Sequence, residues 1–193
     1  MRERRRSGHL GWFGPSRFLL IIVLVGSLAL IAAGVYRLYR NFGGPDPVQA
    51  ADQQMRMAPA FNLPDLDGGM HTLAKFLGDK PLLLEFMDPT CPHCVQMAPI
   101  LTRLHAAYGT KVRFLTVAFE TRNDPRRVRR FVERHTHSWP YLMGNMDVAR
   151  AYRVDGVPSF FLIGSDGRIR GFLEGSATYE AMSRGLEAVL AGR

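Results

Sequence analysis

A chain of 193 residues fits one domain with appendages, and its 47% hydrophobic and 22% charged residues exclude a disordered chain. The net charge of +8 is unevenly distributed, because residues 1–57 carry eight Arg against three acidic residues, whereas residues 58–193 carry seventeen basic against fourteen acidic residues. The excess of basic residues gathers near the N-terminus, and we expect no nucleic-acid partner. Two cysteines exclude a disulfide-rich scaffold.

The first predicted element is a transmembrane helix over residues 18–36. Its stretch FLLIIVLVGSLALIAAGV contains no charge and no proline, and as a helix it would be about 27 Å long, close to the thickness of the hydrocarbon core. Arginines are densest in residues 1–17, which predicts a cytoplasmic basic segment there and a periplasmic location for the rest of the chain. A cleaved signal peptide is the alternative, but its apolar region is usually roughly 7–15 residues long. We therefore predict a signal anchor in the inner (cytoplasmic) membrane.

Residues 37–57 are predicted to be a linker, since glycine and proline interrupt any regular pattern in NFGGPDPVQA. A folded domain is predicted over residues 58–193. Its first elements are a hairpin in FNLPDLDGGMHTL, a strand buried on both faces in PLLLEFM, a helix in CPHCVQMAPILTRLHAAY and a further strand in KVRFLTVAF.

The second half of this domain continues the mixture of helices and strands. NDPRRVRRFVERH predicts a helix capped by Asp124, SFFLIGSDGRIRGFLEG predicts a hairpin around Asp166-Gly167, and TYEAMSRGLEAVL predicts an amphipathic helix. A sheet covered by helices, and therefore an α/β domain, is the fold class that this order indicates.

The only two cysteines, Cys91 and Cys94, form a C-x-x-C motif that follows the buried strand and opens a helix. Three uses of such a pair are open: a redox pair, half of a metal site or a structural clip. A bridge across two residues would constrain the unfolded chain little, which argues against the clip. The position between a strand and a helix is typical of a thioredoxin-like redox motif. We therefore predict a redox-active dithiol that needs no further cofactor.

Residues 58–193 resemble the thioredoxin superfamily. Glu85 lies six residues before Cys91, at the position of the family's buried acid, and GVPSFFLIGSDGRI places Val157-Pro158 before a strand, as in the family's cis-proline loop. The resemblance implies a thioredoxin fold, which is a central mixed sheet flanked by helices, here with an N-terminal β-hairpin extension. From the residues alone, Glu85 could instead face water at the end of a strand, and Pro158 could be an ordinary trans proline.

Two subfamilies imply different directions of electron flow. The anchor, the hairpin and the 63 residues between Cys94 and Pro158 are similar to the membrane-anchored TlpA/ResA type, which carries an extra strand–helix unit there and often serves cytochrome c maturation as a reductant. EFMDPTCPHC is similar to the active-site stretch of DsbA proteins, which are oxidants. The direction stays open between an oxidase or isomerase and a reductase.

The resemblance implies a role for each residue of the motif. Cys91 is the expected nucleophile, because free N–H groups at a helix start favour an anion, and Cys94 resolves the mixed disulfide. Glu85, with its pKa raised by burial, exchanges a proton with Cys94. Pro92 fixes the first helical turn, and His93 adds a donor that makes the disulfide more oxidising.

The expected substrate site lies beside these residues. Backbone groups of Val157 would pair with a substrate strand and Pro158 would shape the groove. Thr90 is assigned to the same surface, although it replaces the tryptophan that usually precedes the first cysteine in thioredoxins. The expected partners are protein thiols and disulfides, a membrane redox partner that resets the cysteine pair, and the membrane itself through the N-terminal helix.

A Sco-like copper metallochaperone is the alternative function, with both cysteines, His93 and a distant histidine as ligands. The candidates for the distant ligand are His71, His105, His135 and His137. Sco-like proteins separate their cysteines by three residues and place their histidine later in the domain, so we expect no metal site. A peroxidase is not expected either, because PTC lacks the P-x-x-x-T-x-x-C spacing of peroxiredoxins. The basic run RRVRR is expected to be a solvated helix face, with contact to lipid phosphates or to an acidic partner as the alternative.

Overall fold

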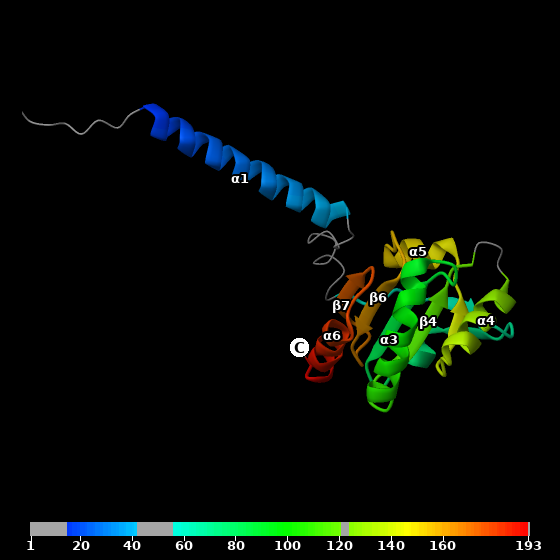
Figure 1. Ribbon diagram of the computed structural model, residues 1–193. Helices are drawn as coiled ribbons and strands as arrows, with labels where there is room; N and C mark the ends of the chain where they lie inside the picture. Colours follow the sequence, from blue (N-terminus) through cyan, green and yellow to red (C-terminus); the bar gives the residue numbers. More distant parts are fainter. Residues whose placement is uncertain (1–14, 42–55, 121–123, 193) are drawn as a thin grey trace, which may run out of the picture. The chain divides into compact units, whose positions relative to one another are not determined.

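The computed structural model describes residues 15–41, 56–120 and 124–192 (Figure 1). The chain divides into two units, 1–42 and 43–193, which are described separately.

The first unit contains α1 (Pro15–Asn41), so the apolar stretch is helical as predicted. Its described side chains, at residues 21–35, are exposed. Across the described ranges, no helix combines the length and the apolar character that crossing a membrane requires. The membrane span over 18–36 stays a prediction, and most of the basic segment 1–17 and of the linker 37–57 lies outside the described residues.

The second unit is built on a five-stranded sheet with the strand order β5-β4-β3-β6-β7. The strands are β3 (Leu82–Met87), β4 (Arg113–Ala118), β5 (Tyr141–Met143), β6 (Ser159–Ile163) and β7 (Ile169–Glu174). The first three are parallel to one another, whereas β6 pairs antiparallel with both β3 and β7, so the sheet is mixed. Every residue of the central strand β3 is buried, as its continuous apolar sequence predicts.

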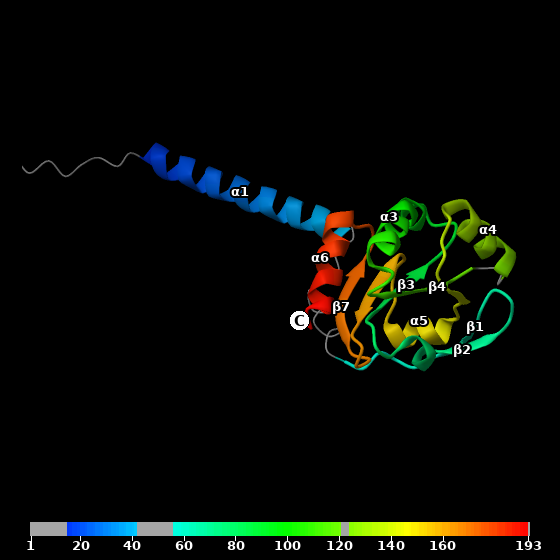
Figure 2. The ribbon, with the colours of Figure 1, turned by 90° about the horizontal axis from the view of Figure 1, so that it is seen from below.

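Helices cover both faces of this sheet (Figure 2). The described helices of this unit are α3 (Pro92–Tyr108), α4 (Pro125–His135), α5 (Met146–Tyr152) and α6 (Tyr179–Leu190). One core lies between the sheet and α3, α4 and α6. The other core lies between the opposite face and α5, the short 3-10 helix η1 (Leu73–Phe76) and the N-terminal hairpin. The sheet with helices on both faces confirms the predicted thioredoxin fold.

The N-terminal hairpin forms where it was predicted, from β1 (Asn62–Pro64) and β2 (Met70–Thr72). Asp65 closes its turn, because the Oδ1 atom accepts hydrogen bonds from the backbone N–H groups of Asp67 and Gly69 at 2.9 and 2.8 Å. The predicted cap of α4 is also present, since Asp124 accepts from the N–H of Arg126 at 3.0 Å.

The strand β5 and the helix α5 are the elements that local sequence patterns did not predict. They lie between α4 and β6, where the resemblance implied an extra strand–helix unit. β5 has three residues, too few to show a period, and it becomes a strand by pairing with β4. Asn145 caps α5 by accepting from the N–H groups of Asp147 and Val148. The loop after α5 leads to Val157, whose carbonyl oxygen lies 3.5 Å from Cys91 Sγ.

Candidate active site

Cys91 is the N-cap residue of α3, directly after the loop that leaves β3. Asp88 shapes this loop: its carbonyl accepts from the N–H of Cys91 at 3.1 Å, and its Oδ1 accepts from the N–H and hydroxyl of Thr90 at 2.7 and 2.6 Å. Pro92 occupies the first helical position, where its fixed φ suits the turn and its missing N–H costs nothing. The thiol of Cys91 therefore lies at the positive end of the helix and is half-buried.

The loop before β6 lies against this thiol. Cys91 Sγ donates to the carbonyl oxygen of Val157 at 3.5 Å, across 66 residues of sequence. The Val157–Pro158 peptide bond is cis, so the ordinary trans proline considered from the residues alone is wrong. Ser159 holds the loop from the other side by donating its hydroxyl to the carbonyl of Gly156 at 2.7 Å. The structure thus brings together the motif and the Val157-Pro158 pair, as predicted.

Cys94 lies one turn further into α3 and is buried, with 1% of its surface exposed. Burial raises the pKa of its thiol well above the ordinary value, and the negative charges of Glu85 and Cys91 add to the effect. The two cysteines are free thiols. They therefore differ in the way that a nucleophile and a resolving thiol must differ, because one is reachable and the other is enclosed.

Glu85 lies in the middle of β3 and is only 3% exposed, so the prediction that it could face water at a strand end is wrong. Burial raises its pKa to about 7, against the opposing effect of a hydrogen bond from the hydroxyl of Thr116 to its Oε2 at 2.8 Å. A carboxyl group that titrates near neutral pH, and that acts electrostatically on the Cys94 thiol, is suited to exchange a proton with it.

His93 is exposed on the first turn of α3, and its Nδ1 lies 3.3 Å from the hydroxyl oxygen of Ser176, in the loop before α6. The contact with Ser176 places His93 Nδ1 near the start of α6, the C-terminal helix. The role of His93 in making the disulfide more oxidising stays a prediction.

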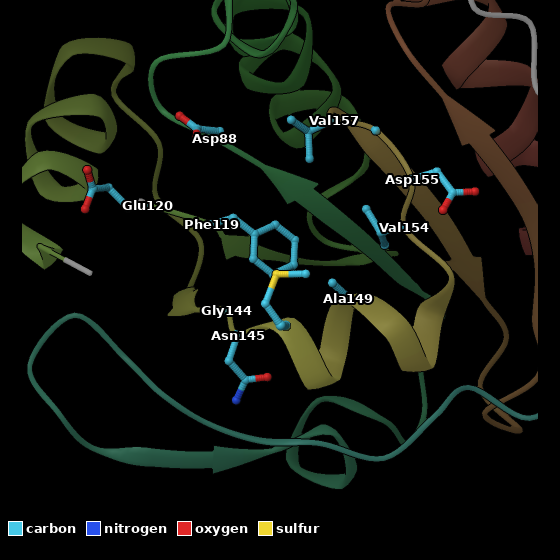
Figure 3. Close-up of a pocket in the computed structure, with 11 residues that line it drawn as sticks. Asp88, Phe119, Glu120, Gly144, Asn145, Ala149, Val154, Asp155 and Val157 are labelled. Atoms are coloured by element: carbon cyan, nitrogen blue, oxygen red, sulfur yellow. The ribbon is translucent and has the colours of Figure 1, made fainter. Parts of the chain in front are cut away.

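A cavity of about 450 Å³ adjoins the active site on the side of Val157 (Figure 3). Its apolar lining comes from Phe119, Met146, Ala149 and Val154, and the carboxylates of Asp88, Glu120 and Asp155 lie around it. Sequence patterns did not reveal this cavity, because its walls come from helix α5 and from four loops that lie far apart in the sequence. Asp88 and Val157 line the cavity and also contact the Cys91 segment, so cavity and thiol share a border.

The four histidines considered as distant metal ligands have other partners or surroundings. His71 Nε2 lies 2.6 Å from Asp65 Oδ2, and His137 is buried between Tyr141 and the carbonyl of Ala98. His105 and His135 pack against the aromatic rings of Trp139 and Phe131. In the described part of the chain, no group of three or more His, Cys, Asp or Glu side chains could hold a metal ion. The copper alternative thus finds no ligand set among these residues.

Comparison with known proteins identifies the family of this chain. The model of the AhpC/TSA family matches residues 55–172. The thiol-disulfide oxidoreductase ResA of Geobacillus thermodenitrificans is 30% identical over 174 residues, which cover 88% of this chain and 95% of that protein.

Solved structures show the same fold. A secreted Mycobacterium tuberculosis disulfide oxidoreductase homologous to Escherichia coli DsbE superimposes with a TM-score of 0.59 at 26% identity, covering 66% of this chain and 95% of its own. A thioredoxin-family thiol:disulfide interchange protein of Chlorobium tepidum gives 0.62 at 20% identity, covering 71% and 97%. The match to the family model and the ResA relative show that this chain belongs to the AhpC/TSA family, among its thiol-disulfide oxidoreductases of the ResA and DsbE type.

Proposed function

We propose that the chain exchanges disulfides with client proteins through Cys91 and Cys94, and that it does so as a reductant. One observation supports the exchange: the two thiols differ in access. The Cys91 thiol lies at a helix start, 3.5 Å from the Val157 carbonyl oxygen, and can be reached. The Cys94 thiol is enclosed, and its charge state depends on the buried carboxyl group of Glu85. No cofactor beyond the dithiol takes part in the proposed reaction.

In the first step the thiolate of Cys91 attacks one sulfur of a client disulfide. The client S–S bond breaks, a Cys91–client disulfide forms, and the departing client sulfur takes a proton from water. The backbone of Val157 borders the thiol, and we assign it the role of pairing with the client strand. Pro158 is assigned the shaping of the groove, and Thr90, directly before Cys91, is assigned to the same contact surface.

In the second step the Glu85 carboxylate accepts the proton of Cys94. The resulting thiolate attacks Cys91 Sγ, the mixed disulfide breaks and the client leaves with its second thiol, which takes up the proton that Glu85 accepted. The client has then gained two electrons and two protons, and Cys91 and Cys94 are joined by a disulfide. A membrane redox partner would return the pair to its reduced state.

The proposal of the reducing direction rests on the similarity to ResA and on the reductant role that the resemblance to the TlpA/ResA type implies. A strong oxidant such as DsbA owes its potential to a stabilised reduced form. Here burial and the charge of Glu85 both disfavour a Cys94 thiolate, so a thiolate that stabilises the reduced pair could only be that of Cys91. The Pro92-His93 dipeptide favours the opposite direction and keeps an oxidase or isomerase as the second candidate.

The client is proposed to extend from Val157 into the adjoining cavity of about 450 Å³. A side chain next to the client cysteine would enter between Phe119 and Met146. The cavity would in this way select clients by a residue that takes no part in the redox chemistry.

For location, we propose that α1 anchors the protein in the inner membrane with the N-terminus in the cytoplasm. The uncharged stretch within α1 and the arginines before it support this arrangement. The catalytic unit would then act in the periplasm on extracytoplasmic clients, such as those of cytochrome c maturation.

The reduction potential of the purified protein, equilibrated in glutathione buffers and measured by thiol trapping, tests the direction. A reduction potential of about −270 mV, that of thioredoxin, is expected for a reductant. A reduction potential of about −120 mV, that of DsbA, would contradict the reducing direction. The oxidising potential would then be attributed to the Pro92-His93 dipeptide. A pair that does not cycle in these buffers would overturn the exchange itself.

A further inference from the structure

Glu85 ends a chain of buried hydrogen bonds that the redox motif does not explain. The hydroxyl of Thr116 donates to Glu85 Oε2 at 2.8 Å, and the indole Nε1–H of Trp139 donates to Thr116 Oγ1 at 2.9 Å. Thr116 is fully buried and Trp139 is 7% exposed. A threonine hydroxyl has a single hydrogen, so with the indole donating to its oxygen this hydrogen is directed at the carboxyl group.

Trp139 is itself fixed in orientation. Its ring stacks on His137 with centroids 4.1 Å apart and contacts the rings of His105 and Phe114 at 5.0 and 5.6 Å. His137 Nε2 lies 3.1 Å from the carbonyl of Ala98, which can only accept, so Nε2 carries the hydrogen. The donor that orients Thr116 is therefore part of a packed aromatic layer and cannot turn away freely.

A buried carboxylate needs such a donor, because burial alone favours its neutral form. The titratable groups that face Glu85 are Cys94 from α3 and Tyr141 from β5, and its partner on β6, Phe160, carries none. Burial raises the pKa of both facing groups, which makes them neutral at the working pH. Among these neighbours, the stabilisation of a negative charge on Glu85 therefore comes from the hydroxyl of Thr116.

We propose that Thr116 and Trp139 are positioning residues that hold Glu85 in its charged, proton-accepting form and so set the pH range in which Cys94 can resolve the mixed disulfide. The inference rests on the proposed role of Glu85 in the second step. Neither residue touches a reacting sulfur. Thr116 acts through Glu85, and Trp139 acts through Thr116.

The test compares Thr116→Val, which keeps the shape of the side chain and removes the donor, with Thr116→Ser, which keeps the donor. The rate of client release from a preformed Cys91 mixed disulfide is measured against pH. A hydrogen bond to the charged form lowers the pKa of a carboxyl group, so the Val variant should move the midpoint about one pH unit upward and slow release about fivefold at pH 7. The Ser variant should keep the wild-type profile, and Trp139→Phe should shift it in the same direction by less.

Two controls separate this inference from the function on which it rests. The first attack, followed as mixed-disulfide formation in a Cys94→Ala background, should be within twofold of the parent when Thr116→Val is added. In a Glu85→Gln background, Thr116→Val should have no further effect on release, because the two residues act in series. Infrared titration of the Glu85 carboxyl group should show the same upward shift.

The outcomes are distinct. If the wild-type protein completes both steps and the profiles of the Val and Ser variants coincide with it, the positioning role is wrong while the exchange stands. If the wild-type protein forms no mixed disulfide, the proposed function itself fails. If Thr116→Val does not fold, Trp139→Phe decides: an unshifted profile would overturn the inference.

Discussion

The two sides of the cysteine pair are built in opposite ways. On the side of Cys91, loops meet. The segment after β3, the Val157-Pro158 loop and the ends of α5 line the cavity beside the thiol. On the side of Cys94, strands meet, and the polar groups are buried in the sheet core. Loops tolerate changes of sequence and carry recognition, whereas packed strands hold groups at fixed distances. The difference supports the proposal that the loop side selects clients and that the strand side transfers the proton.

The two cysteines should give the largest contrast between these sides. Cys91→Ser should lower turnover about a thousandfold or more, since a serine hydroxyl is not ionised at neutral pH and cannot attack a disulfide. Cys94→Ser should instead stop after the first step and accumulate a Cys91–client disulfide, visible as a reducible adduct on a denaturing gel. An adduct in the first variant and none in the second would reverse the assigned roles.

Glu85→Gln should leave the first attack unchanged and slow client release about 100-fold at pH 7, the usual effect of losing a general base. Rapid-quench measurement of the two steps separates them. Glu133→Gln, on the exposed side of α4, is the matched control and should change neither step. Equal slowing of both steps would place Glu85 outside the proton transfer.

Glu85→Gln should also stabilise the protein at high pH. The pKa of Glu85 is raised from 4.5 to about 7 in the fold, so its contribution to stability is complete below pH 4.5 and is lost as the pH rises through 7. Above that range the buried charge costs about 3 kcal/mol, which glutamine avoids. Urea unfolding at pH 5 and pH 8 should therefore give Glu85→Gln a clear advantage only at pH 8.

A change on the loop side should affect clients selectively. Met146 lines the cavity and is 63% exposed, so Met146→Trp can fill the entrance without disturbing the core. We expect kcat/KM for a protein client to fall about fivefold, with an unchanged rate toward dithiothreitol, which needs no side-chain pocket. Met70→Trp on the hairpin, at a similarly exposed methionine, should leave both rates unchanged. A loss with both substrates would show that the substitution disturbs the thiols rather than client binding.

The strand side and the loop side also differ in how far the sequence predicts them. The motif, the buried strand before it and the caps of α3 and α4 have local signals, namely the C-x-x-C spacing, a continuous apolar run, Pro92 and Asp124. The position of Glu85 on the buried strand was predictable for the same reason. Its burial was predicted as well, from the continuous apolar run around it.

The partners of Glu85 have no such local signal. Thr116 is 31 residues further along the chain and reaches Glu85 because parallel pairing of β3 and β4 places the two residues opposite each other. Tyr141 is placed opposite Thr116 in the same way by the pairing of β4 and β5, a strand of three residues that the sequence pattern did not reveal. Register, and not composition, determines this part of the site, and no short window of sequence contains it.

The smallest expected effect concerns the aromatic layer that supports Trp139. Burial lowers the pKa of His137 from 6.5 to about 4, with a partly opposing hydrogen bond to the Ala98 carbonyl. A base whose pKa is lower in the fold contributes stability above pH 6.5 that is lost as the pH falls toward 4, because the unfolded chain takes up the proton first. This slope has the opposite sign to that of Glu85 over the same range.

His137→Gln should remove that slope, because an amide can donate to the Ala98 carbonyl and accept from the hydroxyl of Tyr141 without taking up a proton. The free energy of unfolding of the variant, relative to the wild type, should improve by about 1 kcal/mol between pH 7 and pH 4.5. Client release at pH 7 should change less than twofold, since the indole that orients Thr116 stays packed. A tenfold loss of release with unchanged stability would mean that His137 takes part in the proton transfer. The functional residues on the strand side would then include His137 in addition to Thr116 and Trp139.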